Sequence, residues 1–348
     1  MSSVAIQSSE LTYLLVEQLH LQAESLVAKF EERGGTNYIH GAIGLDREAL
    51  EHRPLGHPKR AVSLTWLSIH LIDRYDQLGE MGDLAEAIVL DREALALRPQ
   101  GHPDRSISLH RLARHLSTRY DQLGAMNDLA MAIVLNREAL ALRPQGHPER
   151  SASLNNLAVD LSTRYDQLGA KEDIAEAIVL GREVLAIYPQ GHPERPASLS
   201  SLAVDLSTRY NQLGAMEDIA EAIVFGREAL ALCLPGHPDR SMSLSNLAVT
   251  LSTRFEQLAA MEDLDEAIVL DREALGLRPR GHPDRSASLS NLAVDLSTRY
   301  DRFGAVEDLD EAIVLCREAL PLYPRGHADR SASLSNLAAR LSTRYNQL

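Results

Sequence analysis

The stretch GHPDRSASLSNLAVDLSTRY, residues 281–300, contains several residue types that commonly bind ligands. A histidine such as His282 can coordinate a metal ion, and an arginine such as Arg299 can pair with a phosphate. Amide and carboxylate groups such as those of Asn291 and Asp295 can hydrogen-bond a peptide backbone. Whether these side chains form a site or belong to a scaffold depends on the elements that carry them.

The same stretch recurs through the chain with a period of 45 residues. Gly-His dipeptides begin at residues 56, 101, 146, 191, 236, 281 and 326. Arginine followed by tyrosine or phenylalanine keeps the same spacing from Arg74 to Arg344. Self-similarity at a fixed period of this length is typical of stacked repeat arrays. The unbroken register predicts one array without an internal linker.

Each repeat predicts two helices. Around residue 160, the apolar residues from Leu154 to Leu161 recur at the spacing of one helical face, and Gly169 is suited to ending that helix. The acidic pair Glu172-Asp173 suits the start of a second helix, which ends before Pro189. Two helices cannot bury both of their apolar faces alone, so neighbouring repeats must stack.

The two ends of the chain depart from the repeat. Residues 10–33 occupy the register of a first helix but match it poorly, so we expect residues 1–35 to form an atypical N-terminal capping helix. Residues 36–348 form the array, and its last repeat stops after a first helix. We expect the protein to continue past Leu348 or the chain to be truncated. The unpaired apolar face of that last helix predicts self-association.

The repeats resemble tetratricopeptide repeats. The residues that follow the family pattern in order are Leu157-Ala158, Leu161, Gly169, Ala177, Val184-Leu185 and Pro189. The departures are a four-residue extension of the first helix, STRY, and a longer loop, QGHPER. Such repeats are similar to those of kinesin light chains and of fungal arrays that often accompany a CHAT domain or a nucleotide-binding module. The resemblance covers nearly the whole chain and implies an all-α, right-handed superhelical solenoid that binds proteins.

Composition narrows the classes of function. The 348 residues carry a formal net charge of −14, which argues against nucleic acid or an anionic membrane as a partner. Two cysteines, no apolar run of about 20 residues and no signal peptide predict a cytoplasmic protein. No motif of a phosphate-binding loop, metalloprotease or serine hydrolase is present. We therefore expect no catalytic residue, no cofactor and no metal.

The recurring histidines and arginines have structural explanations. Axes of packed helices lie about 8–10 Å apart, so successive loop histidines cannot share one metal ion. We expect the proline of His-Pro at the first helical position and the acidic residue after it in the first turn. The arginines, such as Arg164, should pair with acidic residues such as Asp173.

One stripe of the first helix is expected to face away from the core. With Leu154 buried and about 100° per residue, this stripe contains Asn156, Asp160, Thr163 and Gln167. In tetratricopeptide arrays this face lines the concave groove. The asparagine recurs at Asn246, Asn291 and Asn336, and the aspartate at Asp295. A ladder of amides could hold a peptide backbone, but a merely solvated helix face would carry the same residues.

The early repeats differ at the same positions. They carry Trp66, Ile69, His70, His110, Arg111, Arg114 and His115. Tryptophan and arginine are enriched at binding hot spots, so we predict that an acidic peptide with an apolar anchor binds across residues 62–119. Sequence drift near the end of the array is the alternative. Charge reversal at Arg111 and Arg114 should abolish such binding and leave the helices intact.

These observations predict a non-enzymatic scaffold that binds a protein or peptide in its concave groove. The alternative is a sensor or regulatory segment of a larger effector whose catalytic domain, such as a CHAT protease-like domain, lies outside this chain. A purely structural spacer is a third interpretation.

Overall fold

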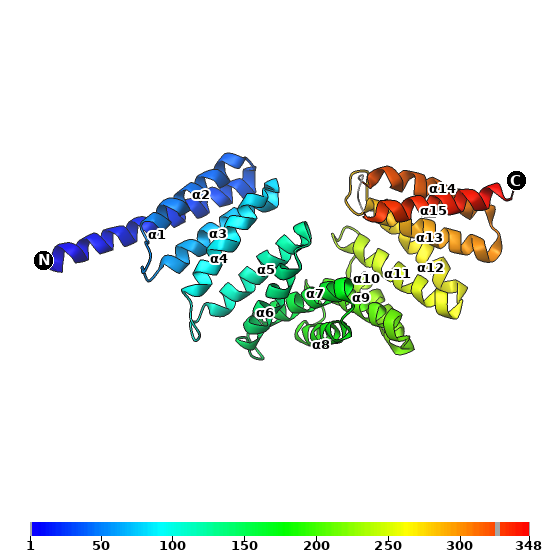
Figure 1. Ribbon diagram of the computed structural model, residues 1–348, viewed down its shortest axis with the longest axis horizontal. Coiled ribbons are helices and arrows are strands. Elements are labelled where there is room, and N and C mark those ends of the chain that lie inside the picture. Colours follow the sequence, from blue (N-terminus) through cyan, green and yellow to red (C-terminus); the bar gives the residue numbers. More distant parts are fainter. Residues whose placement is uncertain (1, 324–327, 348) are drawn as a thin grey trace. The chain divides into compact units, whose positions relative to one another are not determined.

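A computed structural model of the protein describes residues 2–323 and 328–347, with side chains for 12–323 and 330–347 (Figure 1). In these ranges the chain is helical and contains no strand, as the periodicity predicts. The helices are α1 (Ser2–Arg33), α2 (Thr36–Glu51), α3 (Arg60–Leu78), α4 (Met81–Ala96), α5 (Arg105–Leu123), α6 (Met126–Ala141), α7 (Arg150–Leu168), α8 (Lys171–Ile187), α9 (Arg195–Leu213), α10 (Met216–Leu232), α11 (Arg240–Leu258), α12 (Met261–Gly276), α13 (Arg285–Phe303), α14 (Val306–Ala319), the 3₁₀ helix η1 (Leu320–Leu322) and α15 (Ala328–Tyr345).

The helices alternate between two types. We call α3, α5, α7, α9, α11 and α13 the first helices and α4, α6, α8, α10, α12 and α14 the second helices. Each first helix has 19 residues, and five of the six end at a glycine in the left-handed conformation. At Gly124, for example, φ is 67° and the amide N–H donates to the Tyr120 carbonyl at 2.7 Å. The predicted glycine ends are confirmed.

Ala259 takes this position in α11 with φ of 52°, a conformation that is strained for a residue with a side chain. We expect Ala259→Gly to raise the free energy of unfolding by about 1 kcal/mol. Gly214→Ala should have the opposite effect, because a Cβ there meets no atom within 4 Å and only the backbone is strained. Urea denaturation of both variants measures the two shifts, and equal signs would contradict the explanation.

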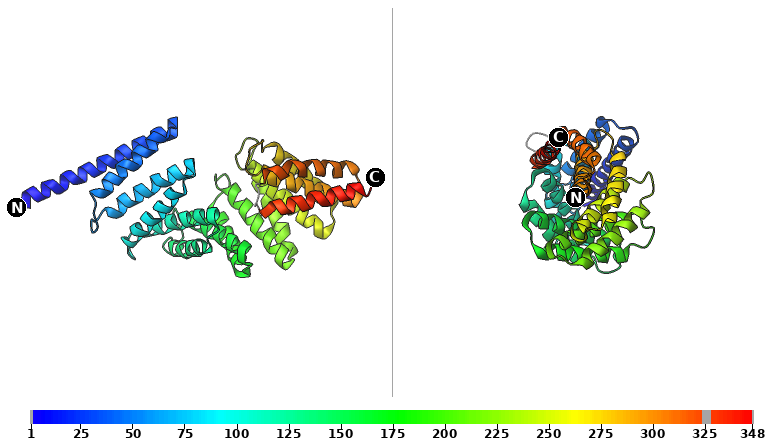
Figure 2. Two further views of the ribbon diagram at one scale, coloured as in Figure 1. Left: turned by 45° about the horizontal axis from the view of Figure 1, so that its top comes forward. Right: turned by 90° about the vertical axis from the view of Figure 1, so that its right-hand side faces the viewer.

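The chain forms two compact units, residues 1–169 and 170–348. Within each unit, a second helix packs against its own first helix and against the first helix that follows it, as with α3, α4 and α5 or α11, α12 and α13 (Figure 1, Figure 2). In the first unit, one apolar core runs without interruption from Ile39 to Ala139. In the second, a core cluster extends from Phe255 to Tyr323. The predicted burial between neighbouring repeats is therefore confirmed.

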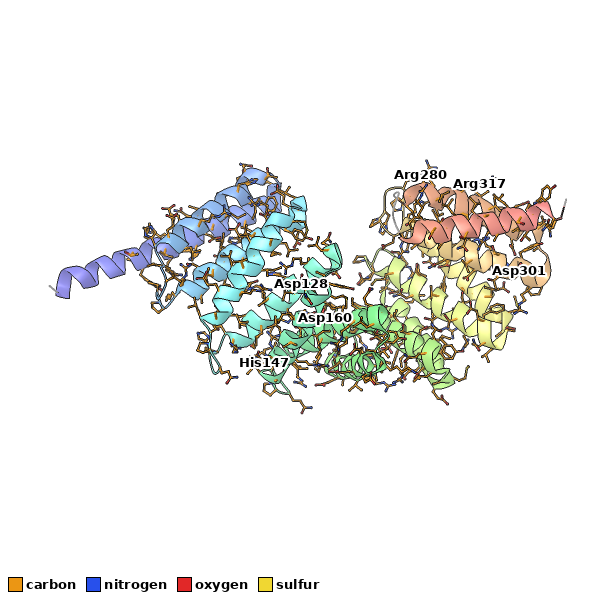
Figure 3. The ribbon with its side chains drawn as sticks, viewed as in Figure 1. Asp128, His147, Asp160, Arg280, Asp301 and Arg317 are labelled. Atoms are coloured by element: carbon orange, nitrogen blue, oxygen red, sulfur yellow. The ribbon has the colours of Figure 1, made fainter. Side chains whose placement is uncertain are left out.

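Ion pairs within the repeats account for the recurring arginines. Asp128, labelled in Figure 3, lies in the first turn of α6. Arg119 near the end of α5 donates to both of its oxygens, at 2.7 and 2.6 Å. The same bidentate pair occurs at Arg74–Asp83, Arg209–Asp218, Arg254–Asp263 and Arg299–Asp308. This confirms the predicted pairing and leaves these guanidinium groups already neutralised.

The loop histidines also have a structural role. His102 Nδ1 accepts a hydrogen bond from the Asp104 amide at 3.1 Å, and the equivalent bond forms at five other histidines. The expected position of the proline is wrong, because α5 begins at Arg105 and Pro103 lies in the turn before it. Among the residues with described side chains, no group of three or more His, Cys, Asp or Glu is placed to hold a metal ion. His327 lies outside the described residues.

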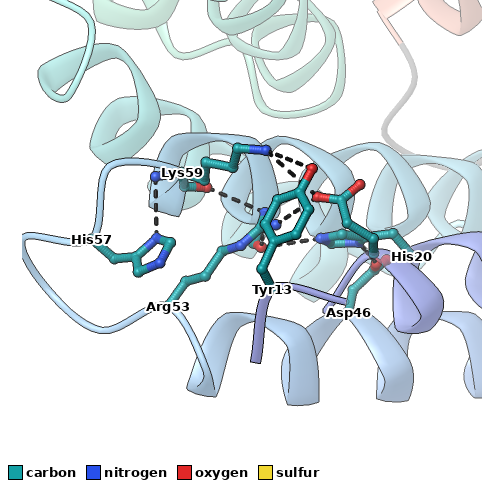
Figure 4. A network of polar contacts seen from close by, with 8 residues as sticks. Tyr13, His20, Asp46, Arg53, His57 and Lys59 are labelled. Carbon is teal, nitrogen blue, oxygen red and sulfur yellow. Dashed lines mark hydrogen bonds and ion pairs between the residues drawn. The ribbon is translucent and has the colours of Figure 1, made fainter. Parts of the chain in front are cut away.

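The N-terminal helix α1 packs on α2 and is joined to α3 by a buried polar network (Figure 4). His20 contacts Asp46 of α2 at 3.0 Å through Nδ1 and Ser63 of α3 at 3.1 Å through Nε2. The buried Arg53 guanidinium donates to Glu17 of α1 at 3.0 Å. These contacts support a capping role for residues 1–35, which stays a prediction.

Among the residues that the structure describes, no helix is both long and apolar enough to span a membrane.

Candidate binding pockets between successive first helices

At several repeat interfaces, a pair of polar residues determines which side chains of the predicted binding stripe are accessible. One member lies on a second helix, and the other lies 24 residues later on the next first helix. In the first unit these pairs are Asp46–His70, Asp91–His115 and Asn136–Asp160. All six residues are buried. The expectation that the first-helix member points away from the core is therefore wrong.

The basic patch of the early repeats is largely neutralised. His70 Nδ1 contacts Asp46 at 2.5 Å, and His115 Nδ1 contacts Asp91 at 2.7 Å. Arg111 Nε donates to the other oxygen of Asp91 at 2.9 Å. The placement of His70, Arg111 and His115 in an exposed basic surface is corrected, because carboxylates on the preceding second helices hold them in the interior.

The electrostatics of Asp46 agree with this arrangement. Burial raises the pKa of Asp46, but hydrogen bonds from His20 and His70 and their positive charge outweigh it and lower the pKa below its usual value. The carboxylate is therefore ionised when the protein is folded, and the histidines beside it serve as its partners.

The remaining members of the patch differ in exposure. Arg114 is exposed, whereas Trp66 and Ile69 are half-buried and the Trp66 ring lies 5.8 Å from the His70 ring. His110 Nδ1 is buried without a hydrogen-bond partner, and burial, with Arg143 and Arg114 nearby, lowers the pKa of His110 to about 4. His110 is therefore neutral at pH 7, and Arg114 supplies the accessible positive charge at these positions.

Asp160 and Asp295 are buried for the same geometric reason. Asp160 accepts hydrogen bonds from Ser117 of α5 at 2.7 Å and from Asn136 of α6 at 2.8 Å. Burial raises the pKa of Asp160 to about 6 despite these donors. A first helix in a stacked array has neighbours on two sides, so the flank that carries this aspartate faces the preceding repeat.

The asparagines of the stripe remain accessible in part. Asn156, Asn246, Asn291 and Asn336 are half-buried. A valine follows three residues after each of Asn156, Asn246 and Asn291, and the sequence analysis did not identify these valines. Val159, Val249 and Val294 are exposed by 48%, 47% and 41%, and Val204 on α9 by 41%. Their repetition at a position outside the core face was the signal that could have identified them.

Each of the two units contains a cavity of the same construction between successive first helices. One, of about 180 Å³, lies between α5 and α7 and the other, of about 190 Å³, between α11 and α13, three repeats later. The first is lined by Arg114, Ser117, Thr118, Asp121, Asn136, Asn156, Val159 and Asp160. The second has Val249, Ser252, Thr253, Glu256, Asp271, Asn291, Val294 and Asp295 at the equivalent positions. Each cavity thus combines an asparagine, an exposed valine and a threonine with a buried polar pair.

Comparison with known proteins agrees with the helical repeat. Residues 150–194, 241–284 and 285–329 match the family model described as tetratricopeptide repeat. A kinesin light chain-like repeat protein of Podosopora anserina is 25% identical, with a TM-score of 0.45, and the match covers 63% of this chain and 98% of that one. A search of curated proteins finds no match.

A chain of the Cut9-Hcn1 hetero-tetramer of APC/C has the same fold. It is 15% identical, with a TM-score of 0.56, and the match covers 98% of this chain and 57% of that chain.

Proposed function

This chain belongs to the tetratricopeptide-repeat family, and from that premise we propose that it is a non-enzymatic scaffold that binds peptides or proteins. The supporting observation is the cavity that recurs between successive first helices, with an asparagine, a valine and a threonine at equivalent positions. An amide donates to and accepts from a peptide backbone, and an exposed valine offers apolar contact. Binding through several such positions distributes the affinity along the array.

Exposed valines on both faces of the second unit allow a matched test. Val204, Val249 and Val294 lie on first helices, and Val224, Val269 and Val314 lie on second helices with exposures of 61%, 63% and 59%. We expect the triple substitution of the first set by glutamate to weaken selected peptides at least tenfold, since charged side chains would replace the apolar contacts. Selection of a displayed peptide library, followed by fluorescence anisotropy, measures the loss.

The second-helix triple variant carries the same added charge and serves as the control. Retention of peptide binding in the control and loss in the first set would support the proposed face. Equal loss in both would show a net-charge effect, and loss only in the second set would move the site to the other face.

The buried ion pairs leave fewer residues available for the proposed acidic-peptide site at residues 62–119. Arg114 is its exposed cation, and the half-buried Trp66 is its tryptophan candidate. Arg111 is unsuitable for charge reversal, because a new carboxylate would face Asp91 in the interior. The same peptide selection with Arg114→Glu therefore tests this proposal, and loss of acidic sequences is the expected outcome.

Two further proposals go beyond peptide binding. We propose as the alternative that the array regulates a catalytic domain, such as a CHAT domain, outside these residues, and sequencing of the full transcript tests this. The helix α15 exposes Leu334 and Tyr345 by 47% and 78%, and we propose self-association through this face in the cytoplasm.

A further inference from the structure

Asp271 on α12 is a buried carboxylate without a hydrogen-bond partner. It is 1% exposed, and neither of its oxygens has a donor within hydrogen-bonding distance. It lines the cavity between α11 and α13 together with Asp295. Asp295 has its own donor, because Ser252 Oγ lies 2.9 Å from each of its oxygens. The unsatisfied group in this cavity is therefore the carboxylate of Asp271.

Equivalent positions show how the chain satisfies such a group elsewhere. Asp46 is paired with His70, and Asp91 is paired with His115 and Arg111. At the third position an amide, Asn136, replaces the carboxylate and donates to the aspartate opposite. At the α12–α13 interface a carboxylate faces a second aspartate, so the next first helix supplies no cation.

We propose that the cavity between α11 and α13 binds a lysine or arginine side chain of a partner peptide, with its cationic group beside Asp271 and Asp295. The nature of this occupant rests on the proposed peptide-binding function. The property of the cavity itself, affinity for an alkyl cation, can be measured without any peptide.

The walls of the cavity fit the stem of such a side chain. Val249, Val294, Leu264 and Phe255 are apolar, and the guanidinium of Arg302 already lies 5.8 Å from the centre of the Phe255 ring. Lysine and arginine bury their methylene stems against apolar surface of this kind. The cavity volume of about 190 Å³ is many times the roughly 10–15 Å³ that a cavity needs to hold one water, so it has room for an alkyl chain.

The surrounding charges favour a cation. Glu256 of α11 and Asp295 of α13 are acidic, and both line the cavity. Arg278, which follows α12, is the positive group that acts on Asp271. Its Nη1 is held by Ser245 at 3.1 Å and Ser288 at 2.5 Å. Arg278 therefore acts on Asp271 through its charge and not through a hydrogen bond. The cavity carries three acidic groups, Asp271, Asp295 and Glu256, against this one positive group.

Binding should depend on pH. Burial, followed by the negative charge of Asp295 and opposed by Arg278, raises the pKa of Asp271 to about 8. Burial raises the pKa of Asp295 to about 6, with a hydrogen bond from Ser252 opposing it and the charge of Glu256 adding to it. A cation favours the deprotonated carboxylates, so binding at pH 7 should release a proton and affinity should increase from pH 6 to pH 8.5.

The test uses the full chain and n-butylammonium, which has the length and charge of a lysine side chain. Isothermal titration at constant ionic strength should show one saturable site whose affinity increases at least tenfold between pH 6 and pH 8.5. Neutral n-butanol should bind at least tenfold more weakly. Butylguanidinium tests the arginine alternative in the same way.

Two variants make the test specific. Asp271→Asn reproduces the pair that the chain already uses at Asn136–Asp160, so it should fold and lose butylammonium binding at least tenfold. The double variant Arg114→Val and Asn136→Asp gives the cavity between α5 and α7 the valine and the aspartate that line the cavity between α11 and α13, with Asp121 in place of Glu256. This double variant should bind two butylammonium ions per chain, whereas the wild type should bind one.

Unsaturable binding of both cations, or equal affinity of the wild type and Asp271→Asn, would overturn the inference. These outcomes leave the proposed function separately testable, because the valine variants report on peptide binding. If the valine variants lose peptide binding but the wild type does not bind butylammonium, the proposed scaffold function stands and the proposed cation-binding cavity is rejected.

Discussion

Replacing Asp271 by asparagine is expected to raise the free energy of unfolding at pH 8.5 by about 1–3 kcal/mol. The wild-type carboxylate is buried without a donor, whereas an asparagine can donate to Asp295. The natural precedent is Asn136, whose amide nitrogen lies 2.8 Å from Asp160. An increase in the denaturation midpoint would be unusual for a buried substitution, because most buried substitutions are destabilising.

The pH dependence of this effect has a defined sign. The pKa of Asp271 is about 8 in the folded protein, against 3.8 for an ordinary aspartate. Between these values the folded state binds more protons than the unfolded state, so this group lowers stability as pH rises from about 4 to about 8. Asp271→Asn should remove this contribution to the pH dependence of the free energy of unfolding. The stability gain of the variant over the wild type should be smallest at pH 4.

Urea midpoints at pH 5, 7 and 8.5 measure the effect on the second unit, with far-UV circular dichroism as the signal. Asp301→Asn, an exposed change on α13, is the matched control and should lie within about 0.5 kcal/mol of wild type at each pH. If Asp271→Asn is destabilised at pH 8.5, the carboxylate has a partner in solution and the proposed cavity chemistry fails with it.

Removing the Asp91 carboxylate is expected to have the largest destabilising effect. Asp91→Ala should lower the free energy of unfolding of the first unit by about 3–5 kcal/mol, the cost of leaving a buried charge uncompensated. Arg111 would retain a 3.0 Å hydrogen bond to Thr65 Oγ, and the carboxylate partner of His115 would be lost. Urea denaturation and amide hydrogen exchange in α4 and α5 would locate the loss.

Two further variants distinguish the loss of a buried, paired carboxylate from the effect of removing any carboxylate. Asp76→Ala removes an exposed carboxylate on α3 and should change stability by no more than about 0.5 kcal/mol. The double variant Asp91→Asn and His115→Asp installs the pair found at Asn136–Asp160 and should recover much of the loss. A change below about 1 kcal/mol for Asp91→Ala would mean that Arg111 reaches solvent and that the patch can bind anions after all.

Local patterns in the sequence determined the architecture of this protein. The period of 45 residues fixed the repeat, and helical spacing from Leu154 to Leu161 placed the core face. Glycine follows five of the six first helices because the chain enters the left-handed region there, as at Gly169 with φ of 67°. Pairs such as Arg119–Asp128 were also predictable, because their partners are nine residues apart across one turn.

Tertiary structure alone decided which polar residues of the first helices are accessible. Helical spacing divides a helix into one buried and one exposed side, but a first helix here packs against two second helices. The flank that carries His115 or Asp160 is therefore buried against a residue 24 positions earlier, beyond the reach of local periodicity. The partner at that distance determines whether the buried group is a satisfied ion pair, as at Asp91, or an unpaired carboxylate, as at Asp271.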